Sequence, residues 1–281
     1  MHGRPASGWF SLPPRGIIAA FHQWPDAVTQ DLHFDQLAPR FGRNIYANLK
    51  GQLRLALLQD DLAPWLELAP LQVLDAGGGQ GQMAAIWAAR GHRVTLVDAA
   101  QPMLAEADTL LRHHGVRDRV CLHHQPLQAF LPQAPRYDLV LCHAVLEWTR
   151  DPRQLLTLLA ERLAPGGRLS LMFYNRHSLV LRNAMGGILH KIQQDKLAGD
   201  GRKLTPINPI DPDTLYRWLE DADLSVQSRR GVRCLFDYMP RVTQRAAQFD
   251  EIMALERPLR GQQPYVHLAR YIHVMANKLG G

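Results

Sequence analysis

Cysteine is scarce in this chain of 281 residues, which contains only Cys121, Cys142 and Cys234. No two of them form a Cys-x-x-Cys pair, which argues against a zinc site and against a disulfide framework. The close histidine pairs in "LRHH" and "CLHHQ" lack the cysteines or carboxylates that complete a metal site, so we expect no metal. So few, widely spaced cysteines fit a reducing, cytoplasmic compartment.

Long hydrophobic runs are also missing, although hydrophobic residues make up 46% of the sequence. The longest runs, such as Leu139 to Leu146, are too short to span a bilayer, and this one contains His143. The N-terminus lacks the basic residues, apolar run and small-residue cleavage site of a signal peptide, in that order. We therefore expect a cytoplasmic protein without a membrane segment, and one large α/β domain accounts for its length.

The net charge of +6 is distributed unevenly along the chain. From Asp31 to Asn175 there are 14 lysines and arginines and 14 aspartates and glutamates, whereas from Arg176 to the end there are 16 against 11. A basic excess of this size favours a polyanionic partner. A scattered, solvated surface would give the same count, and the sequence leaves both interpretations open.

Strand-like and helix-like segments alternate at short intervals up to Phe173, which is typical of a parallel sheet covered by helices on both faces. The predicted helices are Gly51–Leu62, Gln82–Arg90, Pro102–His114, Pro152–Leu163 and Asp213–Ala222. The predicted strands are Leu71–Asp75, Val94–Asp98, Val120–His123, Tyr137–Cys142, Arg168–Phe173, Leu224–Phe236 and Val266–Ala276.

Two segments depart from this alternation. Residues 1–30 contain four prolines and no sustained period, so they are predicted to be a poorly ordered extension before a domain of residues 31–281. Residues 176–211 are rich in glycine, proline and basic residues, and we interpret them as a substrate-binding insertion after the fifth strand.

The stretch VLDAGGGQGQ, Val73 to Gln82, places an acid and four glycines between a strand and a helix. A dinucleotide fingerprint, Gly-x-Gly-x-x-Gly, would have its third glycine one residue later, and no Lys-Ser/Thr pair for a phosphate follows. The loop suits S-adenosylmethionine, whose amino-acid part lies against bare backbone while Asp75 faces its ammonium or sulfonium group. A tight strand-to-helix turn without a ligand is the alternative.

A second acid, Asp98, ends the next predicted strand. A carboxylate there can accept hydrogen bonds from both ribose hydroxyls of an adenosine. NAD would use the same contact, so Asp98 indicates an adenosine cofactor, and the glycine spacing favours S-adenosylmethionine. Asp98 could instead cap the helix that follows it.

Further motifs carry a resemblance to known enzymes. The glycine loop, Asp98, "YDLVLCHAVLEW" and "LAPGGRLSLMFYN" resemble class I methyltransferases, whose α/β, Rossmann-like fold has a seven-stranded, mostly parallel sheet with helices on both faces. The segments "FGRNIYANLKGQLRLALLQDDL", "HAVLEWTRDP", "LSLMFYNRH", "DPDTLYRWLEDAD" and "RYIHVMANK" resemble the tRNA 5-carboxymethoxyuridine methyltransferase family. This resemblance extends from Asp31 to Lys278.

The resemblance implies that S-adenosylmethionine methylates the carboxylate of 5-carboxymethoxyuridine at the tRNA wobble position, giving the methyl ester. The family's cofactor contacts fall here on Arg54 for the cofactor carboxylate, Gly77 and Gly78 for the amino-acid part, Asp98 for the ribose, Leu127 and Gln128 for the adenine, and His143 near the methyl donor. With Asp75 and Gly79 of the loop they form the predicted cofactor site. The stretch "HHQPLQAF" departs from the family at Pro126 and Leu127, where small residues are usual.

A carboxylate is already an anion near pH 7, so its methylation needs no general base. Catalysis then depends on in-line positioning and on excluding water. His143, Tyr174 and Asn175, at the ends of two predicted strands, are the catalytic candidates. A satisfied core histidine and an ordinary strand cap are the alternatives, and Arg54 could instead pair with Asp60 or Asp61.

Cations beyond the fifth strand make a candidate surface for the tRNA anticodon loop, because phosphate contacts need positive charge and splayed bases need stacking partners. A helical cap over the substrate cleft is the alternative, and both can hold. The predicted substrate contacts are Arg43, Tyr46, Arg176, Lys191, Lys196, Arg202, Lys203, Arg230 and Arg233, with Arg182 and Arg229 nearby.

Two other functions stay open. A small-molecule O- or N-methyltransferase would have a similar site, but the basic segment and "MFYN" favour the tRNA enzyme. A non-catalytic adenosine binder or RNA-binding module is the other, but the complete set of Asp75, glycines and Asp98 favours catalysis.

Overall fold

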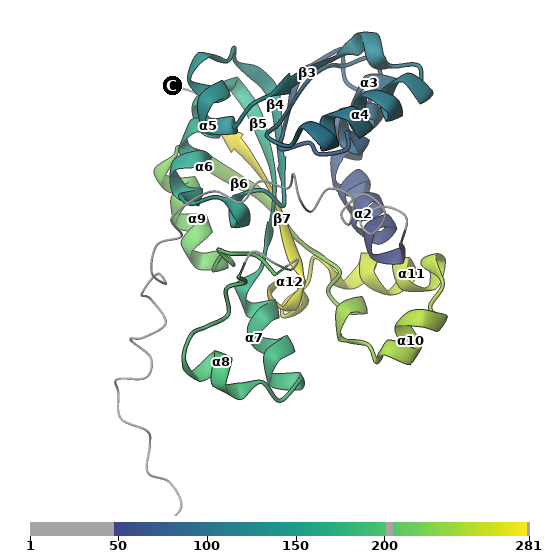
Figure 1. Ribbon diagram of the computed structural model, residues 1–281, viewed down its shortest axis with the longest axis vertical. Coiled ribbons are helices and arrows are strands. Elements are labelled where there is room, and N and C mark those ends of the chain that lie inside the picture. Colours follow the sequence, from purple (N-terminus) through teal and green to yellow (C-terminus); the bar gives the residue numbers. More distant parts are fainter. Residues whose placement is uncertain (1–47, 201–204, 280–281) are drawn as a thin grey trace, which may run out of the picture.

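The computed structural model describes residues 48–200 and 205–279, which form a seven-stranded sheet with helices on both faces (Figure 1). The strand order is β3-β2-β1-β4-β5-β7-β6, and β7 alone runs against the others. The predicted seven-stranded, mostly parallel sheet is confirmed. The strands are β1 (Gln72–Ala76), β2 (Arg93–Asp98), β3 (Val120–His124), β4 (Tyr137–His143), β5 (Leu163–Tyr174), β6 (Leu224–Val232) and β7 (Tyr271–Lys278).

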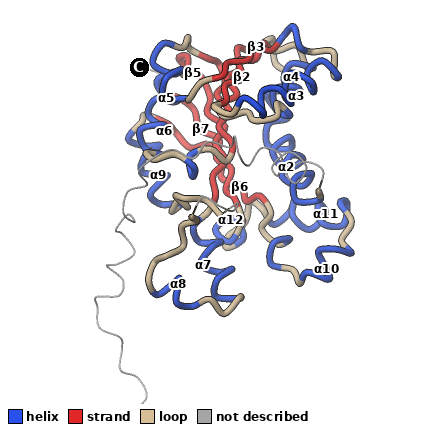
Figure 2. Tube along the Cα trace, viewed as in Figure 1, coloured by secondary structure: helices blue, strands red, loops and turns tan. Residues whose placement is uncertain are grey.

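Helices lie on either side of the strands in two layers (Figure 2). One layer consists of α5 (Leu127–Phe130), α6 (Pro152–Glu161) and α9 (Pro212–Asp221). The other consists of α2 (Leu49–Leu66), α3 (Gln82–Ala89), α4 (Gln101–His113) and α11 (Phe249–Leu259). None of the helices in the described ranges is long and apolar enough to cross a membrane.

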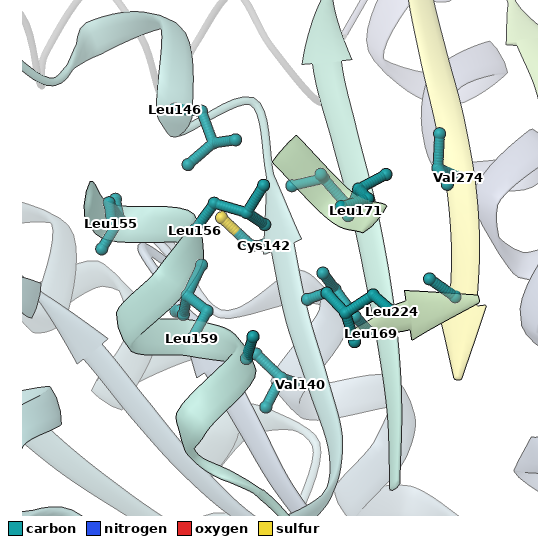
Figure 3. Close-up of a cluster of buried hydrophobic side chains, with 14 of the residues drawn as sticks. Val140, Cys142, Leu146, Leu155, Leu156, Leu159, Leu169, Leu171, Leu224 and Val274 are labelled. Atoms are coloured by element: carbon teal, nitrogen blue, oxygen red, sulfur yellow. The ribbon is translucent and has the colours of Figure 1, made fainter. Parts of the chain in front are cut away.

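Helix α6 illustrates how the sequence builds these layers. The N-cap, Asp151, accepts a hydrogen bond from the Gln154 N–H at 2.9 Å, and a proline follows at the first helical position. Leu155, Leu156 and Leu159 are buried, and Leu156 points at Cys142 of β4 (Figure 3). Each buried leucine contributes roughly 1.5–3 kcal/mol, so one apolar face suffices to dock the helix.

The carboxyl ends of β4, β5 and β6 lie at the edge of the sheet where short helices gather, at the lower end of Figure 1. Ligands of open α/β sheets bind outside this edge. The short elements of the chain are α7 (Arg176–Met185), α8 (Leu189–Gln193), α10 (Arg241–Ala246), α12 (Tyr265–Leu268), η3 (Arg117–Arg119), η4 (Leu131–Gln133), η5 (Leu146–Trp148) and η6 (Phe236–Tyr238).

One helix ends earlier than the sequence predicts. The helix predicted to reach Leu163 ends at Glu161, and Leu163 already pairs with Tyr137 in the sheet. Pro165, Gly166 and Gly167, between the predicted helix and strand, therefore lie inside β5, where Gly166 has a φ of 70° and the register with β4 shifts. An irregular strand of this kind has no period-two pattern by which it could be recognised.

The last two strands are shorter than predicted. The strand predicted over Leu224 to Phe236 ends at Val232, because Arg233 has a φ of 60° and the next backbone N–H groups turn towards Glu256. The strand predicted over Val266 to Ala276 begins at Tyr271, since residues 265–268 form α12. In both places a turn at the carboxyl edge replaces predicted strand.

The domain division remains a prediction, since residues 1–30 lie outside the described part of the chain. Of the predicted insertion, residues 176–200 and 205–211 are described, and they form α7, α8 and a return segment. The return segment reaches the sheet at Ile210, which makes an isolated parallel bridge with Asn175.

A buried ion pair fixes helix α2 against the sheet. The Asp61 carboxylate accepts a hydrogen bond from Arg260, and the two side chains are only 3% and 2% exposed. The same guanidinium donates to the backbone oxygens of Gly231 and Leu57, at 3.0 and 2.9 Å. Because Asp61 and Leu57 belong to α2, Gly231 to β6, and Arg260 follows α11, one side chain joins three elements.

Replacing Arg260 by methionine is expected to lower the free energy of unfolding by about 3–5 kcal/mol, because the Asp61 carboxylate loses its principal partner while buried. The neighbouring pair Arg257–Asp60 is a matched control, since those side chains are 55% and 35% exposed. Arg257→Met is expected to cost at most about 1 kcal/mol. Urea denaturation measures both free energies of unfolding, and equal decreases in the two variants would contradict the larger contribution proposed for the buried pair.

Candidate active site

The glycine loop joins β1 to α3 at the carboxyl edge of the sheet. Gly77 has a φ of 70°, and a Cβ atom there would lie 2.5 Å from Cγ2 of Val145. A Cβ atom on Gly78 would lie 2.7 Å from Cγ of Asp75. At Gly79, with a φ of 55°, no described atom lies within 4 Å of the corresponding position. The first two glycines therefore serve packing within the protein, and the third leaves open space against bare backbone.

Asp75 is buried at the end of β1, and its Oδ2 atom has no hydrogen-bond partner among the described residues. Burial raises its pKa to about 7; a hydrogen bond from the Ala84 backbone lowers the pKa and the charge of Asp98 raises it. Enclosing a carboxylate oxygen without a donor is costly. A ligand with an ammonium or sulfonium group would supply the missing partner.

Asp98 ends β2 and forms a hydrogen bond with the glycine loop. Its carboxylate accepts hydrogen bonds from the backbone N–H of Gly79 at 2.9 Å and of Ala100 at 2.8 Å. The second bond supports the start of α4. Asp98 thus has the alternative role considered from the sequence, at the start of the helix that follows it. A carboxylate offers about four lone-pair sites, and ribose hydroxyls are the partners that the sequence predicts for Asp98.

The predicted adenine contacts lie beside β2. The Gln125 N–H donates to the Asp98 carbonyl at 3.2 Å, which brings the start of α5 to the end of that strand. Leu127 opens α5 and is buried in the core with Val97, whereas Gln128 is partly exposed. The structure thus gathers Asp98, Leu127 and Gln128 at adjacent strand ends, as an adenosine would require.

Glu147 is a site residue that the sequence interpretation missed. It lies in η5, is fully buried, and accepts a hydrogen bond from the Tyr174 N–H at 3.2 Å with Oε1, while Oε2 has no partner among the described residues. Burial raises its pKa to about 8, although backbone hydrogen bonds and the charge of Arg54 lower it. The available signal was a single acid between two large apolar residues, Leu146 and Trp148.

His143 ends β4 and begins a chain of buried hydrogen bonds. Its Nε2 lies 2.8 Å from Ser170 Oγ, which lies 2.8 Å from Nε2 of His273, whose Nδ1 lies 2.7 Å from Oδ2 of Asp61. Burial, together with the charges of His273 and Arg54, holds the pKa of His143 well below its usual value, so the ring is neutral near pH 7.

This chain connects His143 to Asp61. Asp61 accepts from Nδ1–H of His273, and the Ser170 hydroxyl, which can both donate and accept, joins Nε2 of His273 to Nε2 of His143. His143 Nδ1 is buried without a partner among the described residues, so it joins one oxygen each of Asp75 and Glu147 in a group of unsatisfied polar atoms.

Arg54 lies on α2 and faces this group of polar atoms, because its charge shifts the pKa of both His143 and Glu147. The alternative partners considered from the sequence are engaged elsewhere: Asp60 pairs with Arg257, and Asp61 with Arg260. A cation beside unpaired acceptors matches a ligand that carries a carboxylate and an ammonium group.

Tyr174 and Asn175 differ in availability. The Tyr174 hydroxyl accepts a hydrogen bond from Arg182 at 3.1 Å, which leaves its own hydrogen free to donate. Asn175 is fully buried; its amide donates to the carbonyls of His267 and Ala269, at 2.7 and 2.9 Å, and accepts from the His177 N–H. Asn175 is thus the N-cap of α7, and both its amide hydrogens are used within the protein.

Several predicted substrate residues pair with acids. Arg176 pairs with Asp195, Arg230 with Asp61 at 3.4 Å, and Arg233 with Asp237 at 2.8 Å. These arginines connect segments of the fold, and Arg230 alone of the three is half exposed.

The remaining substrate residues are exposed or undescribed. Lys191 lies on α8 and Lys196 just after it; both are exposed, and neither makes an ion pair within the described part of the chain. The other predicted contacts lie outside the described residues, and they are Arg43, Tyr46, Arg202 and Lys203.

Comparison with known proteins agrees with this geometry. A family model described as "Methyltransferase domain" matches residues 46–229. The tRNA 5-carboxymethoxyuridine methyltransferase of Escherichia coli (strain K12) is 43% identical over 254 residues, which cover 89% of this chain and 97% of that protein. Magnesium protoporphyrin IX methyltransferase from Synechocystis PCC 6803, solved with bound SAH, has the same fold, with a TM-score of 0.59, 17% identity, and coverage of 87% of this chain and 96% of that chain.

Asp75→Asn is expected to weaken binding of S-adenosylmethionine by about tenfold or more near pH 8, because a charge-assisted contact is lost. The wild-type affinity is expected to fall as pH drops below about 7, since protonation of Asp75 removes its negative charge. The affinities of the two proteins should therefore become similar near about pH 6, because the wild-type affinity falls by up to tenfold per pH unit.

Isothermal titration calorimetry of both proteins across this range checks the prediction. Asp138→Asn is the control, because that acid bonds to the Gln72 N–H at the opposite edge of the sheet. A constant ratio of wild-type to Asp75→Asn affinity at all pH values would contradict the role of Asp75.

Proposed function

The chain belongs to the tRNA 5-carboxymethoxyuridine methyltransferase family, and on this premise we propose that it methylates the carboxylate of 5-carboxymethoxyuridine at the wobble position of tRNA. The product is the methyl ester. The observation that carries the proposal is 43% identity over 97% of the length of a curated family member. A cytoplasmic location, where tRNA is used, is part of this proposal.

S-adenosylmethionine is the cofactor, and it supplies a methyl group made electrophilic by a sulfonium. The residues present fit it: Asp75 offers an unpaired acceptor for its ammonium group, Arg54 a cation for its carboxylate, and Asp98 a carboxylate for its ribose. The open face of Gly79 lets the amino-acid part approach the backbone.

The substrate carboxylate is the nucleophile, and it needs no proton removed at neutral pH. The residues of the site support this chemistry: His143 is held neutral, and its Nε2 lies within hydrogen-bond distance of the Ser170 hydroxyl. Tyr174 retains a hydroxyl hydrogen with which it can orient the nucleophile. We assign Asn175 a positioning role, since its amide holds the loop at His267 and Ala269 beside the site.

The anticodon loop of the tRNA is proposed to lie across α7 and α8. The two exposed lysines there, Lys191 and Lys196, are without internal acid partners in the described ranges, and Arg202 and Lys203 follow in the sequence. Apolar residues are exposed on the same hairpin, with Met185 at 61% and Leu189 at 53%, and such side chains suit contact with unstacked bases.

Purified protein with S-adenosylmethionine is expected to convert tRNA carrying 5-carboxymethoxyuridine into its methyl ester, detected by nucleoside mass spectrometry. Mild alkali should restore the original nucleoside, because an ester hydrolyses where an ether or N-methyl group does not. Transcripts without the carboxymethoxy group are the control and should stay unmodified.

A methyl group that survives alkali would overturn the proposal in favour of another nucleophile, and activity on a free small molecule would favour the alternative class. The pH dependence is a second readout. With saturating substrates, the single-turnover rate should lack a tenfold rise per pH unit between about pH 6 and 9, since the nucleophile is already ionised.

Replacing Lys191 and Lys196 by glutamine is expected to weaken tRNA binding and to reduce the slope of log affinity against log salt by about 1–2, because up to two phosphate contacts are lost. Affinity for S-adenosylmethionine should be retained. Filter binding between about 50 and 200 mM salt measures the slope.

Arg93→Gln with Arg136→Gln is the matched control. Both residues are exposed, but they precede β2 and β4 and so lie at the opposite edge of the sheet. If the two double variants lost the same affinity and slope, the α8 segment would have no special role in binding tRNA.

A further inference from the structure

A cluster of aromatic and cationic side chains, the Tyr174 cluster, lies where β5 and β6 end and β7 begins. Tyr174 ends β5 and Tyr271 begins β7, and their rings meet edge to face with centroids 5.2 Å apart. Tyr174 packs with Leu179 and Leu197, so the insertion helices cover one side of this cluster. Burial raises the pKa of Tyr174 to about 12, so its phenol is neutral.

Arg270 contributes a guanidinium to this cluster, and two of its nitrogens make no hydrogen bond to the described residues. Its Cζ lies 4.7 Å from the centroid of the Tyr174 ring. Nε and Nη1 are buried and have no hydrogen-bond partner among the described residues, although the residue as a whole is partly exposed. Buried donors without acceptors are unfavourable, and a planar guanidinium matches the two oxygens of a carboxylate.

The backbone of Arg270 is held rigidly. Its N–H donates to the Arg233 carbonyl at 3.1 Å, and its carbonyl accepts from the Asn175 N–H at 3.2 Å. The Cα atom of Arg270 is thus fixed between the ends of β5 and β6, and its guanidinium lies over the Tyr174 ring. A donor held in place in advance loses little freedom on binding, which suits an anion receptor.

Charge in the Tyr174 cluster is unbalanced in favour of cations. Arg182, Arg233 and Arg270 contact Tyr174 or Tyr271, and Lys50 pairs with Asp237. The acids of the described chain beside them are Asp237 and the buried Glu147, which accepts from the Tyr174 N–H. Asp237 is already paired with Arg233 at 2.8 Å and with Lys50 at 3.3 Å. An anionic group from outside would therefore meet uncompensated positive charge.

The Tyr174 cluster adjoins the proposed cofactor site. Helix α2 carries Arg54, whose charge reaches His143 and Glu147, and one turn earlier Lys50, which pairs with Asp237. Glu147 in turn accepts the backbone N–H of Tyr174. An anion bound by the Tyr174 cluster would lie on the substrate side of the predicted methyl donor.

We propose that Arg270, with the Tyr174 hydroxyl and Arg182, binds the carboxylate of the substrate's 5-carboxymethoxy group. This assignment rests on the proposed function and names the residue that recognises the nucleophile. It excludes a role of Arg270 in binding the phosphate backbone, which offers the same negative charge on tRNA of any sequence or modification state.

The test compares two RNAs, tRNA carrying 5-carboxymethoxyuridine and the same tRNA without the modification, bound to the full chain with saturating S-adenosylhomocysteine. Wild type is expected to prefer the modified tRNA by roughly tenfold or more, from one charge-assisted fork. Arg270→Gln should abolish this preference and leave affinity for unmodified tRNA and for the cofactor unchanged.

Two further variants sharpen the comparison. Arg270→Lys keeps the charge but not the fork, so it should retain only part of the preference, and it remains informative if the glutamine variant does not fold. Arg168→Gln is the matched control, because Arg168 also lies over an aromatic ring, Trp65 at 6.0 Å, but it pairs with Asn277 near the end of β7, whereas Tyr174 pairs with Tyr271 at its start. It should keep the full preference.

The outcomes separate the possibilities. Equal loss on both RNAs would assign Arg270 to a phosphate and overturn the proposal, as would loss of cofactor affinity together with a lowered melting temperature. A preference in Arg270→Gln equal to that of wild type would also overturn it, while leaving the proposed function intact. The proposed function itself fails if wild type does not form the methyl ester on the modified tRNA.

Discussion

Where helix α2 lies against β6 and β7, the carboxylate of Asp61 meets Arg260, Arg230 and His273. A helix makes no backbone hydrogen bonds to a sheet, so its rotation depends on side-chain contacts, and a buried charge tolerates little displacement. The position of Asp61 therefore sets where Arg54, two turns earlier, meets the site. Through His273 and Ser170 the same carboxylate is also connected by hydrogen bonds to the histidine at the end of β4.

The site itself is built from groups that destabilise the empty protein. Asp75 and Glu147 have pKa values of about 7 and 8 in the folded chain, against 3.8 and 4.5 for free side chains. Because the folded state holds these protons more tightly, their favourable contribution is complete below the unfolded values and is lost as pH rises through 7 and 8. Near neutral pH a cationic ligand replaces the missing protons, which links binding to stability.

The proposed cofactor contacts could be inferred from the sequence, because Asp75 and Asp98 lie on consecutive strands, Gly77 follows the first strand, and their spacing is a local property. The proposed contact of Arg270 with the substrate could not. Arg270 precedes β7 as a single arginine without a local pattern, and it becomes informative only where the fold brings it to Tyr174. The strand and helix boundaries that were wrong have the same cause, since distant partners such as Glu256 determine where the backbone turns.

Charge counted along the sequence also differs from charge presented by the surface. The excess after Arg176 includes Arg257 and Arg260, which neutralise acids of α2 that were counted in the balanced half. The cations left for a polyanion in the described chain are therefore fewer than the count indicates, and Lys191 and Lys196 are among them. Arg182 lies on α7 and already reaches the Tyr174 hydroxyl. Helix α7 thus joins the surface proposed for the tRNA to the residues proposed for its carboxylate, so that binding the RNA there would also bring its modified base to the site.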